Sequence, residues 1–276
     1  MMRFGAVIAL FVLAACGSNP SGPTPVPPAS ITVQGTLTDT VSGAVLGSFT
    51  QTVAALPALI DVSASGHLPR RARITSDRPT VDLIPDAAPF DLTFYRQLVR
   101  GSLDGPLQPV RVLTSSPSIY LQRTGLSDAT VAALEQAARA VVPALTGGRL
   151  QVAAWETGET ARSLQNGWIM VELVNDSANC GRALIGAVAG RITLNVAERC
   201  LRNDTIVPAV FQHELGHSLG LWHVSDGLMR NPTFTNATVT EAERYHAAIA
   251  YARSAGNIDV DQDVLTSAVV APMVSD

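Results

Sequence analysis

Residues 213–223 read HELGHSLGLWH, and this stretch says more about fold and chemistry than any other part of the chain. Three of the five histidines in the 276-residue sequence lie within it. On a helix, His213 and His217 are one turn apart and leave the same face. Gly220 can adopt the positive φ that ends a helix, so His223 can approach from outside it. The pattern HExxHxxGxxH therefore predicts three imidazoles gathered around one point.

Three imidazoles in this arrangement are the ligand set of a catalytic zinc ion. Histidine nitrogens bind Zn²⁺ tetrahedrally at about 2.0–2.1 Å, and three protein ligands leave the fourth position for water. We therefore expect one Zn²⁺ on His213, His217 and His223. Glu214 follows the first ligand, where its carboxylate can deprotonate the bound water. The sequence thus predicts a catalytic metal site with Glu214 as the general base.

These residues resemble the active site of the metzincin clan of zinc endopeptidases. Members carry a methionine turn after the third histidine, as an apolar floor under the metal. Residues 226–230, DGLMR, fit that turn and make Met229 the floor residue, although a methionine taken alone could be an ordinary core residue. The Leu-Met pair is most similar to the matrixin branch. Asn231 stands where other branches place a tyrosine, so no tyrosine ligand is expected.

The resemblance covers about residues 180–256 and implies a fold and a substrate. It implies an α+β catalytic domain with a twisted mixed sheet, an active-site helix ended by Gly220, and a C-terminal helix. In that family an edge strand above the helix pairs with an extended protein or peptide substrate, and residues 183–188 are the candidate. Main-chain hydrogen bonds hold such a peptide and side-chain pockets select it. An ordinary core hairpin with residues 192–196 is the alternative.

The start of the chain has the pattern of a secretion signal. A short basic beginning precedes the apolar residues 4–13, which are too few to span a bilayer. LAAC at residues 13–16 resembles the bacterial lipobox, whose cleavage leaves a lipidated Cys16. Residues 1–15 are therefore predicted to be a lipoprotein signal peptide. Acyl chains would anchor the folded part to the membrane of the cell envelope, outside the cytoplasm, without spanning it. A soluble secretory signal is the alternative.

Three further segments follow. Residues 16–30 contain the lipidated cysteine and a Pro/Ser/Gly-rich tether. Residues 31–86 carry short β-type runs broken by glycine and proline, which predict a small β-sandwich. Residues 87–276 form the predicted zinc metallopeptidase domain. The sandwich resembles the regulatory-like module of carboxypeptidases. That resemblance rests on GTLTD at 35–39, VSASGH at 62–67 and VDL at 81–83.

The cysteines fit an envelope protein. If Cys16 carries lipid, Cys180 and Cys200 remain as a pair. An oxidising compartment favours a disulfide between them, which would bracket the predicted substrate strand and brace the cleft wall. Two buried free thiols are the alternative.

Periodicity and capping signals predict the elements of the larger domain. Thr240 with Glu243 forms a capping box for the last helix. The expected helices are residues 90–100, 127–142, 207–219 and 240–254. The expected strands are residues 110–113, 119–122, 149–155, 168–174, 183–188 and 192–196.

The charge composition and a second polar segment bear on possible ligands. A net charge of −4, with 19 basic and 23 acidic residues, argues against nucleic-acid binding. Residues 257–263, NIDVDQD, alternate acidic and other residues, and oxygen ligands suit calcium. The glycine and the bidentate glutamate of an EF-hand are missing. We interpret this segment as a solvated acidic turn, with calcium left open.

The sequence as a whole predicts a zinc-dependent endopeptidase that hydrolyses peptide bonds of proteins at the cell envelope. The alternative from another class is a non-catalytic, zinc-containing surface binding module. Hydrolysis of a non-peptide substrate is a third option. Glu214 favours an enzyme, because a purely structural zinc site has no use for that carboxylate.

Overall fold

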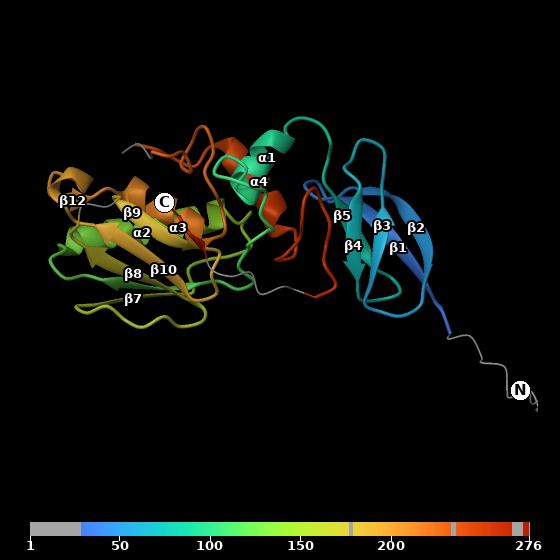
Figure 1. Ribbon diagram of the computed structural model, residues 1–276, viewed down its shortest axis with the longest axis horizontal. Coiled ribbons are helices and arrows are strands. Elements are labelled where there is room, and N and C mark those ends of the chain that lie inside the picture. The colour runs from blue at the N-terminus through green and yellow to red at the C-terminus, as the bar shows by residue number, and fades with distance from the viewer. Residues whose placement is uncertain (1–28, 177–178, 233–235, 267–272, 276) are drawn as a thin grey trace, which may run out of the picture.

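The computed structural model has an α+β architecture, in which a six-stranded mixed sheet with helices is joined to a small N-terminal sandwich (Figure 1). The predicted α+β class is confirmed. No helix in the described part of the chain is both long and apolar enough to cross a membrane. The predicted signal peptide, Cys16 and most of the tether lie outside the described residues. The structure describes residues 29–176, 179–232, 236–266 and 273–275.

The N-terminal sandwich contains five strands, which agrees with the short β-type runs expected in residues 31–86. Strand β1 (Ile31–Asp39) pairs antiparallel with β2 (Val45–Val53) and parallel with β5 (Thr80–Leu83). Strands β3 (Ala58–Val62) and β4 (Arg70–Ile74) form a separate hairpin. Alternate residues of the strands point inward, so the two layers bury one apolar core between them. That core contains Val33, Leu37, Ile60, Val62, Ala72, Ile74, Val81 and Leu83.

The six-stranded sheet has the order β13-β9-β10-β8-β6-β7. Strands β7, β6, β8 and β10 run parallel, whereas β9 is antiparallel to β10 and β13 is antiparallel to β9. A short 3₁₀ turn, η1 (Glu198–Cys200), and the small hairpin β11 (Leu201–Arg202) and β12 (Thr205–Ile206) follow β10. The sheet strands are β6 (Ser118–Gln122), β7 (Ala154–Gly158), β8 (Trp168–Val174), β9 (Gly181–Ile185), β10 (Gly190–Asn195) and β13 (Met273–Val274).

Four α-helices complete the fold: α1 (Leu92–Arg100), α2 (Asp128–Ala144), α3 (Pro208–Ser218) and α4 (Glu241–Tyr251). The Ser127 hydroxyl accepts from the amide of Thr130 and caps α2. The capping box of Thr240 and Glu243 is present at the start of α4. Helix α3 packs between α2 and the strands β9 and β10, so the central sheet positions it.

Three expectations about strands need correction. Residues 110–113 are not a strand, because the backbone of Val110 bonds to Asn257 and Gly256 instead of joining the sheet. The strand expected at residues 149–155 begins at Ala154, as β7. Strand β9 is not the outermost strand, since the two-residue strand β13 covers its free side. A strand of two residues is too short to show periodicity, so β13 could not be predicted from the sequence pattern.

The segment of residues 257–263 joins the two parts of the chain. The Arg71 amide donates to the carbonyl of Asp261 at 3.1 Å, and the Asp263 amide donates to the carbonyl of Arg71 at 2.8 Å. The segment therefore extends the hairpin of β3 and β4 along the edge of β4. It is held from the other side by Arg100, whose guanidinium is fully buried and donates to the side-chain and main-chain oxygens of Asn257.

Buried ion pairs reinforce this junction. Arg70 lies 2.8 Å from Asp82 and 2.9 Å from Asp263, and Arg253 lies 2.8 Å from Asp261. Asp261 is 1% exposed and Asp263 is 5% exposed. The interpretation of this segment as a solvated acidic turn is therefore wrong: its carboxylates are the partners of buried arginines. The division of the chain into a sandwich and a peptidase domain stays a prediction.

Two adjacent arginines on β4 test the junction. Arg70→Ala leaves the buried Asp263 without its guanidinium partner, so we expect a loss of about 3–5 kcal/mol in the free energy of unfolding. Arg71→Ala removes a solvent-exposed pair with Asp61 and is the matched control, with little change expected. Urea unfolding followed by circular dichroism measures both. Equal effects of the two substitutions would contradict the proposed role of the buried pairs.

Candidate metal centre

Helix α3 carries the first two histidines and ends in a sharp turn. Pro208 is its first residue, where proline's fixed φ suits the first turn and its missing N–H costs nothing. Past its end, Gly220 has a φ of +95° and donates its amide to the carbonyl of His217 at 2.8 Å. The Leu221 amide donates to Gly216 at 3.1 Å, which closes the end of the helix.

Gly220 is required for a second reason. A Cβ at this position would lie 2.0 Å from the carbonyl oxygen of Arg111, so the chain turns in close contact with that backbone. The returning segment is then fixed on α1, where the amide of Trp222 donates to the carbonyl of Leu98 at 2.7 Å. This turn brings His223 back over the helix, as the sequence predicted.

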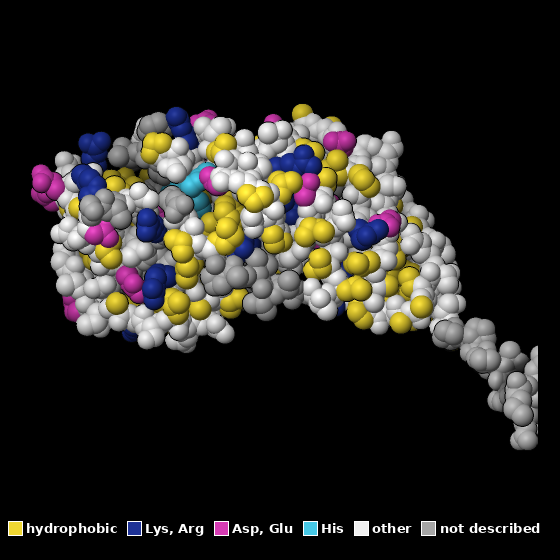
Figure 2. Space-filling view, in the orientation of Figure 1, with side chains coloured by type: hydrophobic (Ala, Val, Ile, Leu, Met, Phe, Trp, Pro, Cys, Tyr) yellow, Lys and Arg dark blue, Asp and Glu magenta, His cyan; other side chains and the backbone are white. Residues whose placement is uncertain are grey.

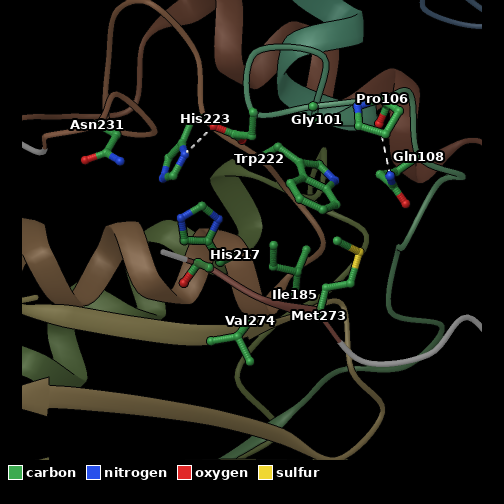
Figure 3. Close-up of a pocket in the computed structure, with 13 residues that line it drawn as sticks. Gly101, Pro106, Gln108, Ile185, His217, Trp222, His223, Asn231, Met273 and Val274 are labelled. Atoms are coloured by element: carbon green, nitrogen blue, oxygen red, sulfur yellow. Dashed lines mark hydrogen bonds and ion pairs between the residues drawn. The ribbon is translucent and has the colours of Figure 1, made fainter. Parts of the chain in front are cut away.

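The three histidines meet in the interior. His213, His217 and His223 are 5%, 1% and 6% exposed, and each has a ligand atom within 4.8 Å of those of the other two. The Nε2 atoms of His213 and His217 are 3.1 Å apart. The predicted gathering of the three imidazoles is confirmed, and Figure 3 shows the ring of His223 close to that of His217.

Each imidazole is held by its Nδ1 atom. Main-chain carbonyls and a carboxylate only accept hydrogen bonds, so each Nδ1 must carry a proton, and in the neutral ring the lone pair is then on Nε2. Two such lone pairs 3.1 Å apart repel one another unless a cation lies between them, and this donor set fits Zn²⁺. The Nδ1 partners are Leu228 O at 2.8 Å for His213, Leu221 O at 2.8 Å for His217, and Asp104 Oδ1 at 2.9 Å for His223.

Burial keeps the first two imidazoles neutral. Desolvation lowers the pKa of His213 to about 4 and holds the pKa of His217 well below its usual value. Both rings are therefore uncharged at neutral pH. A neutral imidazole is the form that binds a metal ion, so these side chains need not lose a proton to do so.

Glu214 lies beside the histidines and is 5% exposed. Strand β9 passes so close that a Cβ on Gly181 would lie 2.4 Å from Glu214 Oε1, which explains the glycine there. The hydroxyl of Ser275 donates to Glu214 Oε2 at 3.4 Å. Burial raises the pKa of the Glu214 carboxyl to about 8, and a cation bound to the histidines would lower it by attraction.

The turn after His223 supports α3 from below. Met229 is fully buried, and its sulfur would lie 2.3 Å from a Cβ on Gly216, in the turn of α3 between His213 and His217. The sequence-predicted turn methionine is thus packed against the ligand helix. The Val224 amide donates to the carbonyl of Met229 at 3.0 Å and closes the turn.

Sequence reasoning missed the second role of Glu243. Besides capping α4, its fully buried carboxylate accepts from the amides of Leu228 at 3.2 Å and Met229 at 2.7 Å. It therefore fixes the turn whose Leu228 carbonyl orients His213. The capping-box pattern pointed to this residue, but only the fold shows that its carboxylate reaches the turn.

Asp104 was also missed. It lies in the loop that follows α1, which starts at Gly101 with a φ of +65°. Asp104 is 119 residues from His223 in sequence, so no local spacing could have indicated their hydrogen bond. Carboxylate partners of this kind orient a ligating histidine and raise its basicity.

A cleft of about 300 Å³ opens beside the histidines. The loop after α1 forms one side and the strands β9 and β13 form the other (Figure 3). Histidine atoms reach the surface at a spot over α3 in Figure 2. Solvent or a substrate can therefore approach the three histidines from this side. Its lining includes Gly101, Asp104, Ile185, His217, Trp222, His223, Asn231 and Met273.

Cys180 and Cys200 form the predicted disulfide, with an S–S distance of 2.03 Å. Cys180 lies directly before β9 and Cys200 ends the turn η1. The bond closes a loop of about 20 residues that contains β9 and β10, which restricts the unfolded chain and braces the wall of the cleft.

The predicted zinc ligands, Glu214, Gly220 and Met229 all meet in one place. Within the described part of the chain, the three histidines are the one group of His, Cys, Asp and Glu side chains placed to hold a metal ion, and the segment 257–263 is not such a group. No family model matches the chain, and no curated protein matches it.

Removing the Nδ1 partner of His223 tests the geometry of the site. Asp104→Ala should weaken zinc binding by about 10- to 100-fold, because the imidazole loses the hydrogen bond that orients it. Asp128→Ala removes an exposed carboxylate that is not part of the cleft lining and is the control. Competition with a chromophoric chelator measures the affinity. Unchanged affinity in Asp104→Ala would contradict the arrangement described.

Proposed function

We propose that this protein is a zinc-dependent endopeptidase that hydrolyses peptide bonds of proteins at the cell envelope. The observation that carries the proposal is the convergence of three Nε2 lone pairs beside a buried carboxylate. The resemblance to metzincins, and to the matrixin branch in the residues of the turn, agrees with this arrangement. The buried Met229 against the ligand helix supports it further.

Each residue has a role in the proposed reaction. A zinc ion on the histidines would act as a Lewis acid that acidifies water and polarises the carbonyl of the scissile bond. Glu214 accepts the proton of the attacking water and passes it to the nitrogen of the leaving amine. The low exposure of the Glu214 carboxylate strengthens this proton transfer, because little bulk water competes for it.

The surroundings agree with an extended substrate outside the cytoplasm. The cleft is open on one side, and β9 borders it with β13 paired along its outer side. A peptide that displaced β13 could pair with the main chain of β9. The disulfide between Cys180 and Cys200 fits an oxidising compartment. Lipid attachment at Cys16 would hold the protein at the membrane by its predicted tether.

The alternative is a binding module in which zinc only stabilises the fold. The burial of Glu214 speaks against it. A buried carboxylate is costly unless it has partners, and the only hydrogen bond found for it among the described residues comes from Ser275 at 3.4 Å. A structural zinc site would gain nothing from a buried carboxylate with so few partners. A general base, in contrast, must keep a carboxylate oxygen free to accept the proton of a water molecule.

Replacing Glu214 tests the proposed reaction. Glu214→Gln keeps the shape of the side chain but removes the proton acceptor, so cleavage of an unfolded casein-like protein should fall by about 10²-fold or more. Zinc content, measured by atomic emission, should stay at one ion per chain. His217→Ala should lose both zinc and activity.

The outcomes separate the two functions. Cleavage by the wild-type protein that stops with a chelator and returns with zinc supports an enzyme. A pure Glu214→Gln protein that cleaves as fast as wild type would refute the assignment of the general base. Stoichiometric zinc without cleavage of any protein or peptide substrate would favour the binding module.

A further inference from the structure

A segment of the chain itself lies on the strand that borders the cleft. In the antiparallel pair of β13 and β9, Met273 stands opposite Ile185 and Val274 opposite Leu184. The amide of Ser275 donates to the carbonyl of Ala183 at 2.9 Å. Residues 273–275 therefore use the main-chain groups of β9 with which any extended peptide would have to pair.

Ser275 connects this segment to the general base. It is 5% exposed, and its hydroxyl accepts from the Ala183 amide at 2.8 Å. The same hydroxyl lies 3.3 Å from the carbonyl oxygen of Ala183 and 3.4 Å from Glu214 Oε2, and its one proton can be donated to either. Ser275, which directly follows β13, therefore lies next to the Glu214 carboxylate. In the proposed reaction this carboxylate must bind the attacking water.

The segment also fills part of the cleft. Met273, Val274 and Ser275 all belong to its lining, together with Ile185 and His217. Figure 3 shows Met273 beside Ile185, on the side of the cleft opposite the loop that carries Gly101. A peptide bound along β9 would need the same space and the same hydrogen bonds. The two cannot bind at once.

We propose that β13 is a built-in competitor for the substrate groove, which holds the protein in a self-blocked state. This inference rests on the proposed peptidase function. The groove then accepts an extended peptide that runs antiparallel to β9, with a small hydroxyl residue next to Glu214. Because the strand is only two residues long, its release exposes few groups and breaks few hydrogen bonds. The block is therefore reversible.

Truncation tests the block. A chain that ends at residue 272 should cleave a peptide substrate with a kcat/KM about tenfold higher or more, the factor expected if the groove is free in a tenth of the molecules or fewer. A synthetic peptide with the sequence of residues 271–276 should inhibit the truncated protein competitively, and a scrambled peptide should not. Equal kcat/KM in the two proteins would overturn the proposal. So would a lower kcat after truncation, which would make Ser275 a positioning residue for Glu214.

A point variant covers the case in which the truncated chain does not fold. Ser275→Glu places a long charged side chain where a serine is 5% exposed, so the cost of burying it should expel the strand and raise kcat/KM in the full chain. Ser48→Glu makes the same change on the exposed face of β2 and is the matched control. In hydrogen exchange, residues 181–185 should be protected in wild type and lose protection in Ser275→Glu. Unchanged protection and unchanged kcat/KM would overturn the proposal.

A binding measurement separates this inference from the peptidase proposal. The truncated Glu214→Gln protein should bind the fluorescently labelled 271–276 peptide, and the full-length Glu214→Gln protein should bind it at least about tenfold more weakly. If neither the wild-type nor the truncated protein cleaves any substrate but this difference in affinity is found, the peptidase proposal fails. The proposal that β13 occupies the groove is then still supported. If cleavage occurs but both proteins bind the peptide equally, the self-block is refuted and the peptidase stands.

Discussion

The hydrogen bonds at the three Nδ1 atoms are the constraint on which the candidate centre depends. Each bond fixes the tautomer of one histidine and turns its Nε2 lone pair toward the same point. Without them, the imidazoles could protonate at Nε2 and bond to each other or to water. Other parts of the structure hold the partners of these bonds in place. The turn at Gly220 returns the chain to the helix, the loop after α1 carries Asp104, and the carboxylate of Glu243 fixes the turn that contains Leu228.

This support comes from all over the chain. Helix α4 contributes Glu243, which fixes the turn that orients His213, and Tyr251, whose hydroxyl donates to the carbonyl of Leu219 at the end of α3. The segment after α4 pairs with β4 and ties the N-terminal sandwich to the same body through buried arginines. A rigid scaffold around a site keeps the metal-binding side chains in the geometry that the metal requires. The cleft border is the exception, because β13 is a short strand at the edge of the sheet.

Local patterns could be predicted from the sequence, whereas contacts between distant segments could not. The spacing of the three histidines, the turn at Gly220 and the capping box of α4 are set within about ten residues, and the structure has all of them. Asp104 and the covering of β9 by β13 depend on the path of the whole chain. The segment 257–263 was predicted to be solvated because two of its buried partners, Arg70 and Arg100, lie more than 150 residues away in sequence. The lipid anchor and the zinc itself stay predictions.

The most direct test of the central claim is anomalous diffraction at the zinc edge from crystals grown with equimolar zinc. The account predicts one peak, about 2.0–2.1 Å from the Nε2 atoms of His213, His217 and His223, with Glu214 beside it and not bound to it. A peak bound through Nδ1, a peak with fewer than three of these ligands, or a peak elsewhere in the protein would contradict it.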